Sequence, residues 1–530
     1  MTLNNGQKLA LEKINIFLNS DKRIFILKGY AGTGKTTILK ELIGRYENDN
    51  NFIALATTGA ASKVLSSKIN SVVSTVHSEV YKYKETQKTK DEYNYIFEIR
   101  NRLQSADKRN VYIVDEASMI GNDPAEQENR VSFGSNKSLQ DFLQKTLSEN
   151  KNSKIIFVGD PMQLPPVGST KSVALDKESL KKIFNVECLE ATLTEIMRQN
   201  YGNTIQEESI KLRECFENKK EYILKPDNKN IFGINYNYIP NFYSKYEDVG
   251  IITHSNRKAL AISQKIREIH FGKSPKEIEI GDKLLVVFNN HKINLMNGEL
   301  VKVKFILEKY SKDISLNYED KEKNKTITLK FVKAIIENEK KQGITTWILL
   351  NFLNDSEYKT NEPYISDALS KLAEQLNQDP YECIYFNALR VRYGYAITCH
   401  KSQGSEFDIV ILENRKIKEE EESYKWVYTG MTRAKNKLYL FDPQSVYDYS
   451  GNKLEETRST LELQTEKMIV KKEEENNSTK KQKMKKTLSI KLPKEKIKKG
   501  NDKKYFFDIK LPKEKAKKEN DKKYTFKIKL

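Results

Sequence analysis

The sequence contains few of the residues that build disulfide frameworks and metal sites. It has four cysteines among 530 residues, none in a CxxC pair, and five histidines, none paired at metal-ligand spacing. A disulfide-stapled secreted domain and a zinc domain are therefore disfavoured, and the reducing cytosol fits best. On these grounds we expect a cytoplasmic protein.

Long apolar runs are also missing. No stretch approaches the roughly 18 consecutive apolar residues of a membrane-spanning helix, and the first residues lack the apolar core of a signal peptide. We therefore expect no membrane partner. With 38% hydrophobic residues the chain can still bury several cores, and its length suggests about three or four domains.

The formal net charge of +19 is concentrated at one end of the chain. Residues 471–530 contain 23 lysines and nine acidic residues, which leaves a net charge of only +5 for the first 470 residues. This tail holds a 19-residue repeat, 490–508 and 509–527. Two interpretations stay open: a solvated, disordered arm, or an arm that binds nucleic-acid phosphates without sequence preference.

Short apolar segments that end in polar residues recur in the first part of the chain, at 24–27, 52–58, 111–116 and 154–160. A segment with helical spacing of apolar residues follows the first of them. Strands that alternate with helices predict a parallel sheet covered on both faces. The chemistry of such a sheet is expected at the carboxyl ends of its strands.

The same pattern returns at 249–256, 394–404, 408–414 and 437–441. These segments predict a second α/β unit. Between them, residues 278–355 contain consecutive β-like segments separated by turns, which favours a small β-barrel inserted into the second unit.

Residues 29–36, GYAGTGKT, match the pattern GxxxxGK[ST] after a strand and before a helix. In this context the glycines let backbone N–H groups curl around phosphates, and the following helix presents the positive end of its dipole. Lys35 can then reach the β- and γ-phosphates, and Thr36 can offer its hydroxyl to Mg²⁺. The alternative, a tight turn with an incidental lysine, is disfavoured by the flanking strand and helix.

Two other strands end in side chains that suit the same chemistry. Asp115 is placed to hold Mg²⁺ directly or through water, and Glu116 is a candidate base for the attacking water. Gln163 can sense a γ-phosphate or orient water, and Pro165 and Pro166 stiffen a loop that can contact a further ligand. A surface acidic pair and a rigid turn are the alternative interpretations.

Six stretches of the sequence occur in the order GYAGTGKTT, VDEAS, GDPMQLPPV, LTEIMRQ, YAITCHKSQGSEF and VYTGMTRAKNKLYL. They resemble the ordered motifs of superfamily 1 helicases, and the RecD-like and Dda-like group is the most similar. They run in the family's order from about residue 3 to 442, over four-fifths of the chain.

The resemblance implies two RecA-like P-loop NTPase domains with ATP between them. Gln7 would bind the adenine, and Arg198 and Arg433 would be arginine fingers that stabilise phosphoryl charge when the cleft closes. The implied catalytic residues are Lys35, Asp115, Glu116, Gln163, Arg198 and Arg433, with Thr36 and Asp115 as metal ligands. The implied nucleotide contacts are Gln7, Gly29, Ala31, Gly32, Thr33, Gly34, Lys35, Thr36, Thr37, Gly404 and Glu406.

The resemblance also implies a set of strand contacts, since hydroxyls and backbone amides hold phosphates without reading sequence. These are Thr57, Thr75, His77, Pro165, Thr253, Asn256, Thr398, His400, Lys401 and Ser402. His77 has the alternative of a packed core histidine. Residues 80–107 occupy the place of the family's strand-separating pin; their tyrosines either stack on bases or belong to a structural hairpin.

The expected fold class is thus α/β, with two parallel-sheet domains, a hairpin insert in the first, an SH3-like barrel insert in the second and a lysine-rich disordered tail. The expected boundaries are 1–190 for the first domain, 191–277 and 356–450 for the second, 278–355 for the barrel and 451–530 for the tail. The loop at 121–140 is longer and more polar than expected and is given no role.

The resulting expectation is an ATP- and Mg²⁺-dependent helicase that moves along single-stranded DNA, 5′ to 3′ by resemblance, and unwinds partial duplexes. Two alternatives stay open: an RNA helicase of the same superfamily, and a scaffold that binds nucleic acid and uses ATP as a switch. The sequence leaves protein partners, pathway and oligomeric state open, a monomer being one option.

Deletion of residues 471–530 is expected to weaken single-strand binding mainly at low salt, because lysine–phosphate contacts are screened as salt rises. Oligonucleotide titrations of the full and shortened chains at about 50 and about 200 mM salt measure this. Equal affinities of both proteins at both concentrations would exclude a phosphate-binding arm.

Overall fold

The computed structural model describes most of the first 441 residues. Arg198 and the expected tail at 451–530 lie outside the described residues. The described ranges are 3–89, 92–100, 108–122, 131–197, 203–290, 292–316, 325–338, 341–356, 358–380, 382–414 and 421–441.

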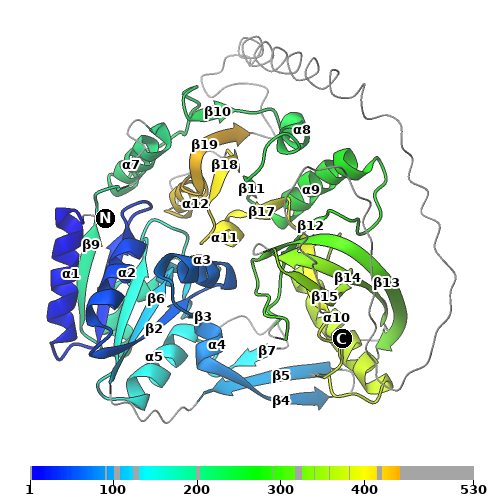
Figure 1. The fold of residues 1–530 in the computed structure, drawn as a ribbon, viewed down its shortest axis with the longest axis horizontal. Coiled ribbons are helices and arrows are strands. Elements are labelled where there is room, and N and C mark those ends of the chain that lie inside the picture. The colour runs from blue at the N-terminus through cyan, green and yellow to red at the C-terminus, as the bar shows by residue number, and fades with distance from the viewer. Residues whose placement is uncertain are drawn as a thin grey trace, which may run out of the picture. The chain divides into compact units, whose positions relative to one another are not determined.

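The first lobe is built on a six-stranded sheet in the order β3-β2-β6-β8-β1-β9, in which every neighbouring pair is parallel (Figure 1). Its strands are β1 Ile24–Gly29, β2 Asn50–Ala56, β3 Val73–Thr75, β6 Arg109–Asp115, β8 Lys154–Gly159 and β9 Cys188–Leu193. Its helices are α1 Asn5–Leu18, α2 Lys35–Tyr46, α3 Gly59–Ile69, α4 Val76–Val80, α5 Ser138–Glu149 and α6 Lys177–Phe184, with short 3₁₀ turns η1 Ala117–Met119 and η2 Val173–Leu175.

Alternation of side chains along β1 explains why both faces of this sheet are covered. Phe25 and Leu27 belong to a core with side chains of α1, α2 and α3, whereas Ile24 and Ile26 belong to a second core with α5 and α6. Successive residues of a strand point to opposite faces, so a wholly apolar strand needs helices on each side. The carboxyl edge of the sheet, at Gly29, is thereby fixed as the exit point of the phosphate loop.

The second lobe is built on a five-stranded parallel sheet in the order β10-β19-β18-β11-β17. Its strands are β10 Ile231–Gly233, β11 Val249–Thr253, β17 Ala396–Thr398, β18 Phe407–Glu413 and β19 Ala434–Phe441. Its helices are α7 Thr204–Glu217, α8 Ile239–Tyr243, α9 Asn256–Phe271, α11 Cys399–Ser402 and α12 Glu421–Met431, with the 3₁₀ turn η3 Tyr236–Tyr238. The expected α/β fold class with two parallel sheets is confirmed.

A closed five-stranded barrel interrupts the second lobe. Its strands are β12 Lys283–Val286, β13 Leu300–Leu316, β14 Lys325–Asn338, β15 Gly343–Leu349 and β16 Leu389–Tyr393. The last strand lies beyond the expected insert at 278–355, after helix α10 Tyr358–Gln375. Two residues separate β16 from β17 of the second sheet. The likeness to an SH3 domain stays a prediction.

The insert expected at 80–107 contains a β-hairpin formed by β4 Tyr81–Thr89 and β5 Glu92–Ile99, and β5 also pairs with β7 Val131–Phe133. Three of its four tyrosines, Tyr81, Tyr93 and Tyr95, are buried. The backbone N–H of Tyr93 donates to Asp367 Oδ1 of α10 (3.1 Å), and the Tyr95 hydroxyl is bonded to Ser370 of the same helix. Base stacking by these three rings is therefore wrong for this structure, which favours the structural hairpin.

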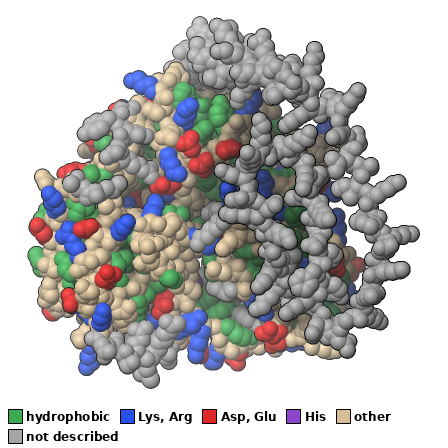
Figure 2. All heavy atoms as spheres, viewed as in Figure 1, with side chains coloured by type: hydrophobic (Ala, Val, Ile, Leu, Met, Phe, Trp, Pro, Cys, Tyr) green, Lys and Arg blue, Asp and Glu red, His purple; other side chains and the backbone are tan. Residues whose placement is uncertain are grey.

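The surface of the described residues carries charges of both signs. Figure 2 shows basic and acidic side chains interspersed over the visible face, as the small net charge of the first 470 residues leads one to expect. In the described part of the chain, none of the helices has the length and apolar character required to cross a bilayer.

Candidate nucleotide site

The phosphate loop connects β1 to α2. Gly32 and Gly34 have φ angles of 79° and 82°, in the left-handed region where a side chain is strained, so the turn requires glycine at both positions. Gln7, which is 3% exposed, donates from Nε2 to Thr33 O (3.2 Å) and so closes one side of the loop. The predicted nucleotide residues from Gln7 to Thr37 are therefore gathered at one place.

Lys35 turns back over its own loop. Its ammonium donates to Gly29 O (2.6 Å) and Tyr30 O (3.2 Å). Thr36 and Thr37, half-buried, follow it in the first turn of α2. The cation thus stands at the mouth of a loop whose helix dipole also favours an anion.

The predicted acidic pair ends β6, on the same edge of the sheet. Burial of the Asp115 carboxyl and the neighbouring charge of Glu116 raise the pKa of Asp115 to about 6, and the positive charge of Lys35 opposes this rise. Glu116 has a φ angle of 52°, in the left-handed region that residues with a side chain rarely adopt. Backbone strain of this kind is concentrated at functional sites.

Gln163 joins the two lobes through its side chain. With its amide nitrogen facing Glu116 Oε2 (3.2 Å), its oxygen accepts from Arg433 Nη2 (3.3 Å). Arg433 is 4% exposed and donates also from Nε to Thr429 O (3.0 Å) and from Nη1 to Ser405 O (3.2 Å). The structure therefore brings together three residues predicted to act in catalysis, one from each of three distant motifs.

Asp160 is a member of the site that the sequence reasoning missed. It is fully buried and accepts from the Tyr428 hydroxyl (2.9 Å) and the Met162 N–H (2.9 Å). Its burial raises its pKa, and the charge of Lys35 opposes this. The sequence did contain a signal for Asp160, because this acidic residue directly follows β8 in the same way that Asp115 ends β6. Tyr428 carries no charge and gave no comparable signal.

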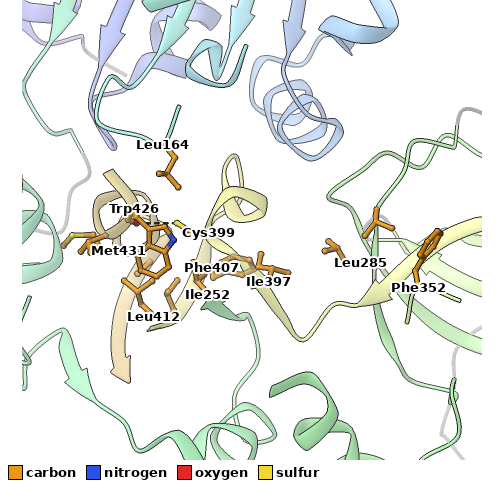
Figure 3. Close-up of a cluster of buried hydrophobic side chains, with 14 of the residues drawn as sticks. Leu164, Ile252, Leu285, Phe352, Ile397, Cys399, Phe407, Leu412, Trp426 and Met431 are labelled. Carbon is orange, nitrogen blue, oxygen red and sulfur yellow. Dashed lines mark hydrogen bonds between the residues drawn. The ribbon is translucent and has the colours of Figure 1, made fainter. Parts of the chain in front are cut away.

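The segment after β8 is held by the second lobe. Leu164 N donates to Thr429 Oγ1 (3.0 Å), and Leu164 O accepts from Gln403 Nε2 (2.9 Å). Figure 3 shows the Leu164 side chain pointing toward the apolar cluster that contains Trp426 and Met431 of α12. The main chain and the side chain of Leu164 thus both contact the second lobe.

Gly404 and Glu406 lie against α3 of the first lobe. A methyl group on Gly404 would come within 2.9 Å of Ala61 Cβ, and Gly404 has a φ angle of 78°. Glu406 lies 4.0 Å from the Lys68 ammonium. Their assignment to the nucleotide stays a prediction.

The strand contacts predicted in the first lobe have different environments. The Thr57 hydroxyl lies 3.5 Å from Met119 Sδ. Thr75 caps α4, where its hydroxyl accepts from Ser78 N (3.2 Å), and Pro165 is buried. His77 is exposed and is described below.

His77 combines the two interpretations offered for it. Its ring packs against Tyr81 and Phe133, with centroids 5.7 Å and 5.6 Å away, yet the residue is exposed. The packing fixes the ring, and the exposed side remains accessible.

Three of the strand contacts predicted in the second lobe line one small pocket. They are Asn256, Thr398 and Lys401. Arg392 of the barrel lines the same pocket, and its Nη1 donates to Asn256 Oδ1 (2.8 Å). Arg392 was missed by the sequence reasoning because it belongs to a strand that was not predicted as part of the barrel.

The other second-lobe contacts are less accessible. Thr253 and Ser402 are fully buried, and their hydroxyls donate to Ser255 O (3.1 Å) and Cys399 O (2.7 Å). His400 is half-buried. The role of all these residues toward a strand stays a prediction, as does that of Arg198, which lies outside the described residues.

Two family models match the chain. An AAA domain model matches residues 2–220, and a UvrD-like helicase C-terminal domain model matches residues 393–441. These ranges contain the phosphate loop, the acidic pair and Gln163 on one side, and Arg433 on the other.

Relatives with similar sequences cover most of the chain. The uncharacterized protein MJ1519 of Methanocaldococcus jannaschii is 27% identical over an alignment of 479 positions, and the match covers 82% of this chain and 38% of that protein. The RecBCD enzyme subunit RecD of Buchnera aphidicola is 25% identical over an alignment of 507 positions, and the match covers 83% of this chain and 74% of that subunit. The chain thus spans well under half of the Methanocaldococcus protein.

Among solved structures, a Pif1 helicase from Bacteroides in complex with ADP-AlF3 and single-stranded DNA is 16% identical, with a TM-score of 0.42 and coverage of 83% of this chain and 92% of that one. The two matched models and the RecD relatives show that this chain is similar to superfamily 1 helicases of the RecD group.

Proposed function

We propose that the chain is an ATP-dependent DNA helicase that moves along single-stranded DNA and unwinds duplexes by hydrolysing Mg-ATP between its two lobes. One observation carries this proposal: Gln163 stands between Glu116 of the first lobe and Arg433 of the second, beside the phosphate loop. Such an arrangement suits hydrolysis that depends on lobe closure.

The roles of the residues follow from their places. Backbone amides of the phosphate loop and the Lys35 ammonium hold the phosphates, for which Lys35 exchanges its carbonyl partners for phosphate oxygens. Glu116 orients and activates the attacking water, and Gln163 aligns it. Arg433 stabilises the charge that develops on the transferred phosphoryl group, a contribution that falls away when the second lobe withdraws.

Magnesium fits this donor set. The described residues contain no group of three or more His, Cys, Asp or Glu side chains placed to hold a metal by themselves. Mg²⁺ at nucleotide sites is held by one or two carboxylates together with substrate phosphates and waters. Thr36 and Asp115 would hold it here, and the metal would neutralise phosphate charge.

Movement along a strand would follow from the same closure. The predicted grips are distributed over both lobes, with Thr57 and His77 in the first and Asn256, Thr398 and Lys401 in the second. Each closing event would shift one set relative to the other. DNA as the substrate and the 5′-to-3′ direction rest on the resemblance to the RecD-like group.

Unwinding of partial duplexes tests the proposal directly. We expect ATP-dependent strand separation of a DNA duplex with a 5′ single-stranded overhang and little with a 3′ overhang. The same experiment with RNA oligonucleotides of matched sequence tests whether the chain prefers deoxyribose or ribose strands. Strand separation from the 3′ overhang alone would show that the chain moves in the opposite direction. ATP hydrolysis without any strand separation would reduce the proposal to a strand-stimulated ATPase.

Lys35→Ala should reduce strand-stimulated ATP hydrolysis by about 100-fold or more, since removal of a phosphate-binding cation destabilises the transition state. Oligonucleotide binding should remain, because the strand residues are untouched. Lys28→Ala is the matched control: Lys28 lies in the preceding strand and pairs with Glu190 (2.9 Å). Near-normal turnover of Lys35→Ala would refute the assigned site.

Asp115→Asn should abolish hydrolysis and yet raise the melting temperature above pH 7. The folded-state pKa of Asp115 is raised to about 6, so the ionised carboxylate is costly in the folded chain above that pH and the cost vanishes toward pH 4. We expect a gain of about 2 °C at pH 8 and a clearly smaller gain near pH 4.5, in metal-free buffer. A lower melting temperature at pH 8 would contradict this.

A further inference from the structure

The first half of the phosphate loop is in contact with the second lobe. Tyr30 and Ala31 pack against an apolar cluster composed largely of second-lobe residues. The guanidinium of Arg213, on α7, lies 3.7 Å from the centre of the Tyr30 ring. Ala31 N donates to the hydroxyl of Tyr428, on α12, at 3.0 Å. The loop that is to hold phosphates is therefore touched by two helices of the other lobe.

The Tyr428 hydroxyl accepts one hydrogen bond and donates another. The residue is 1% exposed, accepts from Ala31 N and donates to Asp160 Oδ2 at 2.9 Å. Asp160 is itself fully buried and stands at the end of β8. A hydrogen-bonded chain thus runs from a phosphate-loop amide through Tyr428 to a first-lobe carboxylate. Phenylalanine at this position would fill the same space and break both bonds.

The next residues along the chain connect this contact to the arginine. Thr429 accepts from Leu164 N with its hydroxyl (3.0 Å), and its carbonyl accepts from Arg433 Nε (3.0 Å). Tyr428 and Thr429 therefore fix the end of α12 on the segment after β8, and the same backbone orients the Arg433 guanidinium. The position of Arg433 beside Gln163 depends on this attachment.

We propose that Tyr428 is a positioning residue for ATP hydrolysis, which sets the place of Arg433 relative to Gln163 and Glu116 by linking Ala31 and Asp160. The inference rests on the proposed function. Tyr428 acts through Arg433. Arg213 supports the same contact by stacking on Tyr30.

A tyrosine elsewhere in the chain offers a matched control. Tyr222 is buried, and its hydroxyl donates to Glu208 Oε2 at 2.5 Å, with both residues in the second lobe. Like the bond between Tyr428 and Asp160, this is a hydrogen bond from a buried tyrosine hydroxyl to a carboxylate. Its loss should lower stability and leave the lobe contact unchanged.

Tyr428→Phe should lower kcat for strand-stimulated ATP hydrolysis about tenfold, which corresponds to about 1.4 kcal/mol of lost transition-state stabilisation. KM for ATP should change less than about twofold, because ground-state binding by Lys35 and the glycine amides is kept. Tyr222→Phe should keep both constants within about twofold, although its melting temperature falls. Thr429→Val, which removes the hydroxyl that Leu164 N binds, should reproduce the kcat effect if Tyr428→Phe folds poorly.

A double substitution separates positioning from a general loss of structure. In an Arg433→Ala background, Tyr428→Phe should cause little further loss of kcat, because the residue that it positions is gone. Equal losses in both backgrounds, or an unchanged kcat in the single variant, would overturn the inference. A wild-type chain without strand-stimulated hydrolysis would instead refute the proposed function.

Discussion

The short segment that follows β8 is the constraint on which the site depends. Its buried polar groups find their partners in the second lobe: Asp160 in Tyr428, Gln163 in Arg433, and the Leu164 amide in Thr429. A buried polar group without a partner is costly. The two lobes therefore separate only as water replaces these bonds, so nucleotide chemistry and lobe position are linked by the same few atoms.

The sequence was sufficient for the parts of the site that depend on local geometry. A glycine-rich turn between a strand and a helix has few conformations, so the phosphate loop could be placed, together with Lys35. Glu116 and Gln163 followed from the rule that parallel strands gather their carboxyl ends at one edge. Arg433 needed the resemblance to a family, because nothing in its surroundings in the sequence distinguishes it from a surface arginine.

Contacts between residues far apart in the chain could not be predicted from the sequence. Tyr428 meets Ala31 and Asp160 only after two separate sheets have formed, and no spacing encodes that meeting. The barrel was foreseen up to β15, but its fifth strand follows a long helix and pairs parallel to β15, which a turn-based pattern does not reveal. Tyr93 and Tyr95 of the hairpin likewise became core residues, because α10 covers them.

The short joint between β16 and β17 has a mechanical consequence. Only Gly394 and Tyr395 lie between a barrel strand and a strand of the second sheet; a methyl group on Gly394 would meet Leu300 and the backbone of β12. Tyr395 is itself anchored, since its hydroxyl donates to Asp282 Oδ1 (3.0 Å). Because this connection is short and anchored, we expect the barrel and the second sheet to move together as one body when the lobes move.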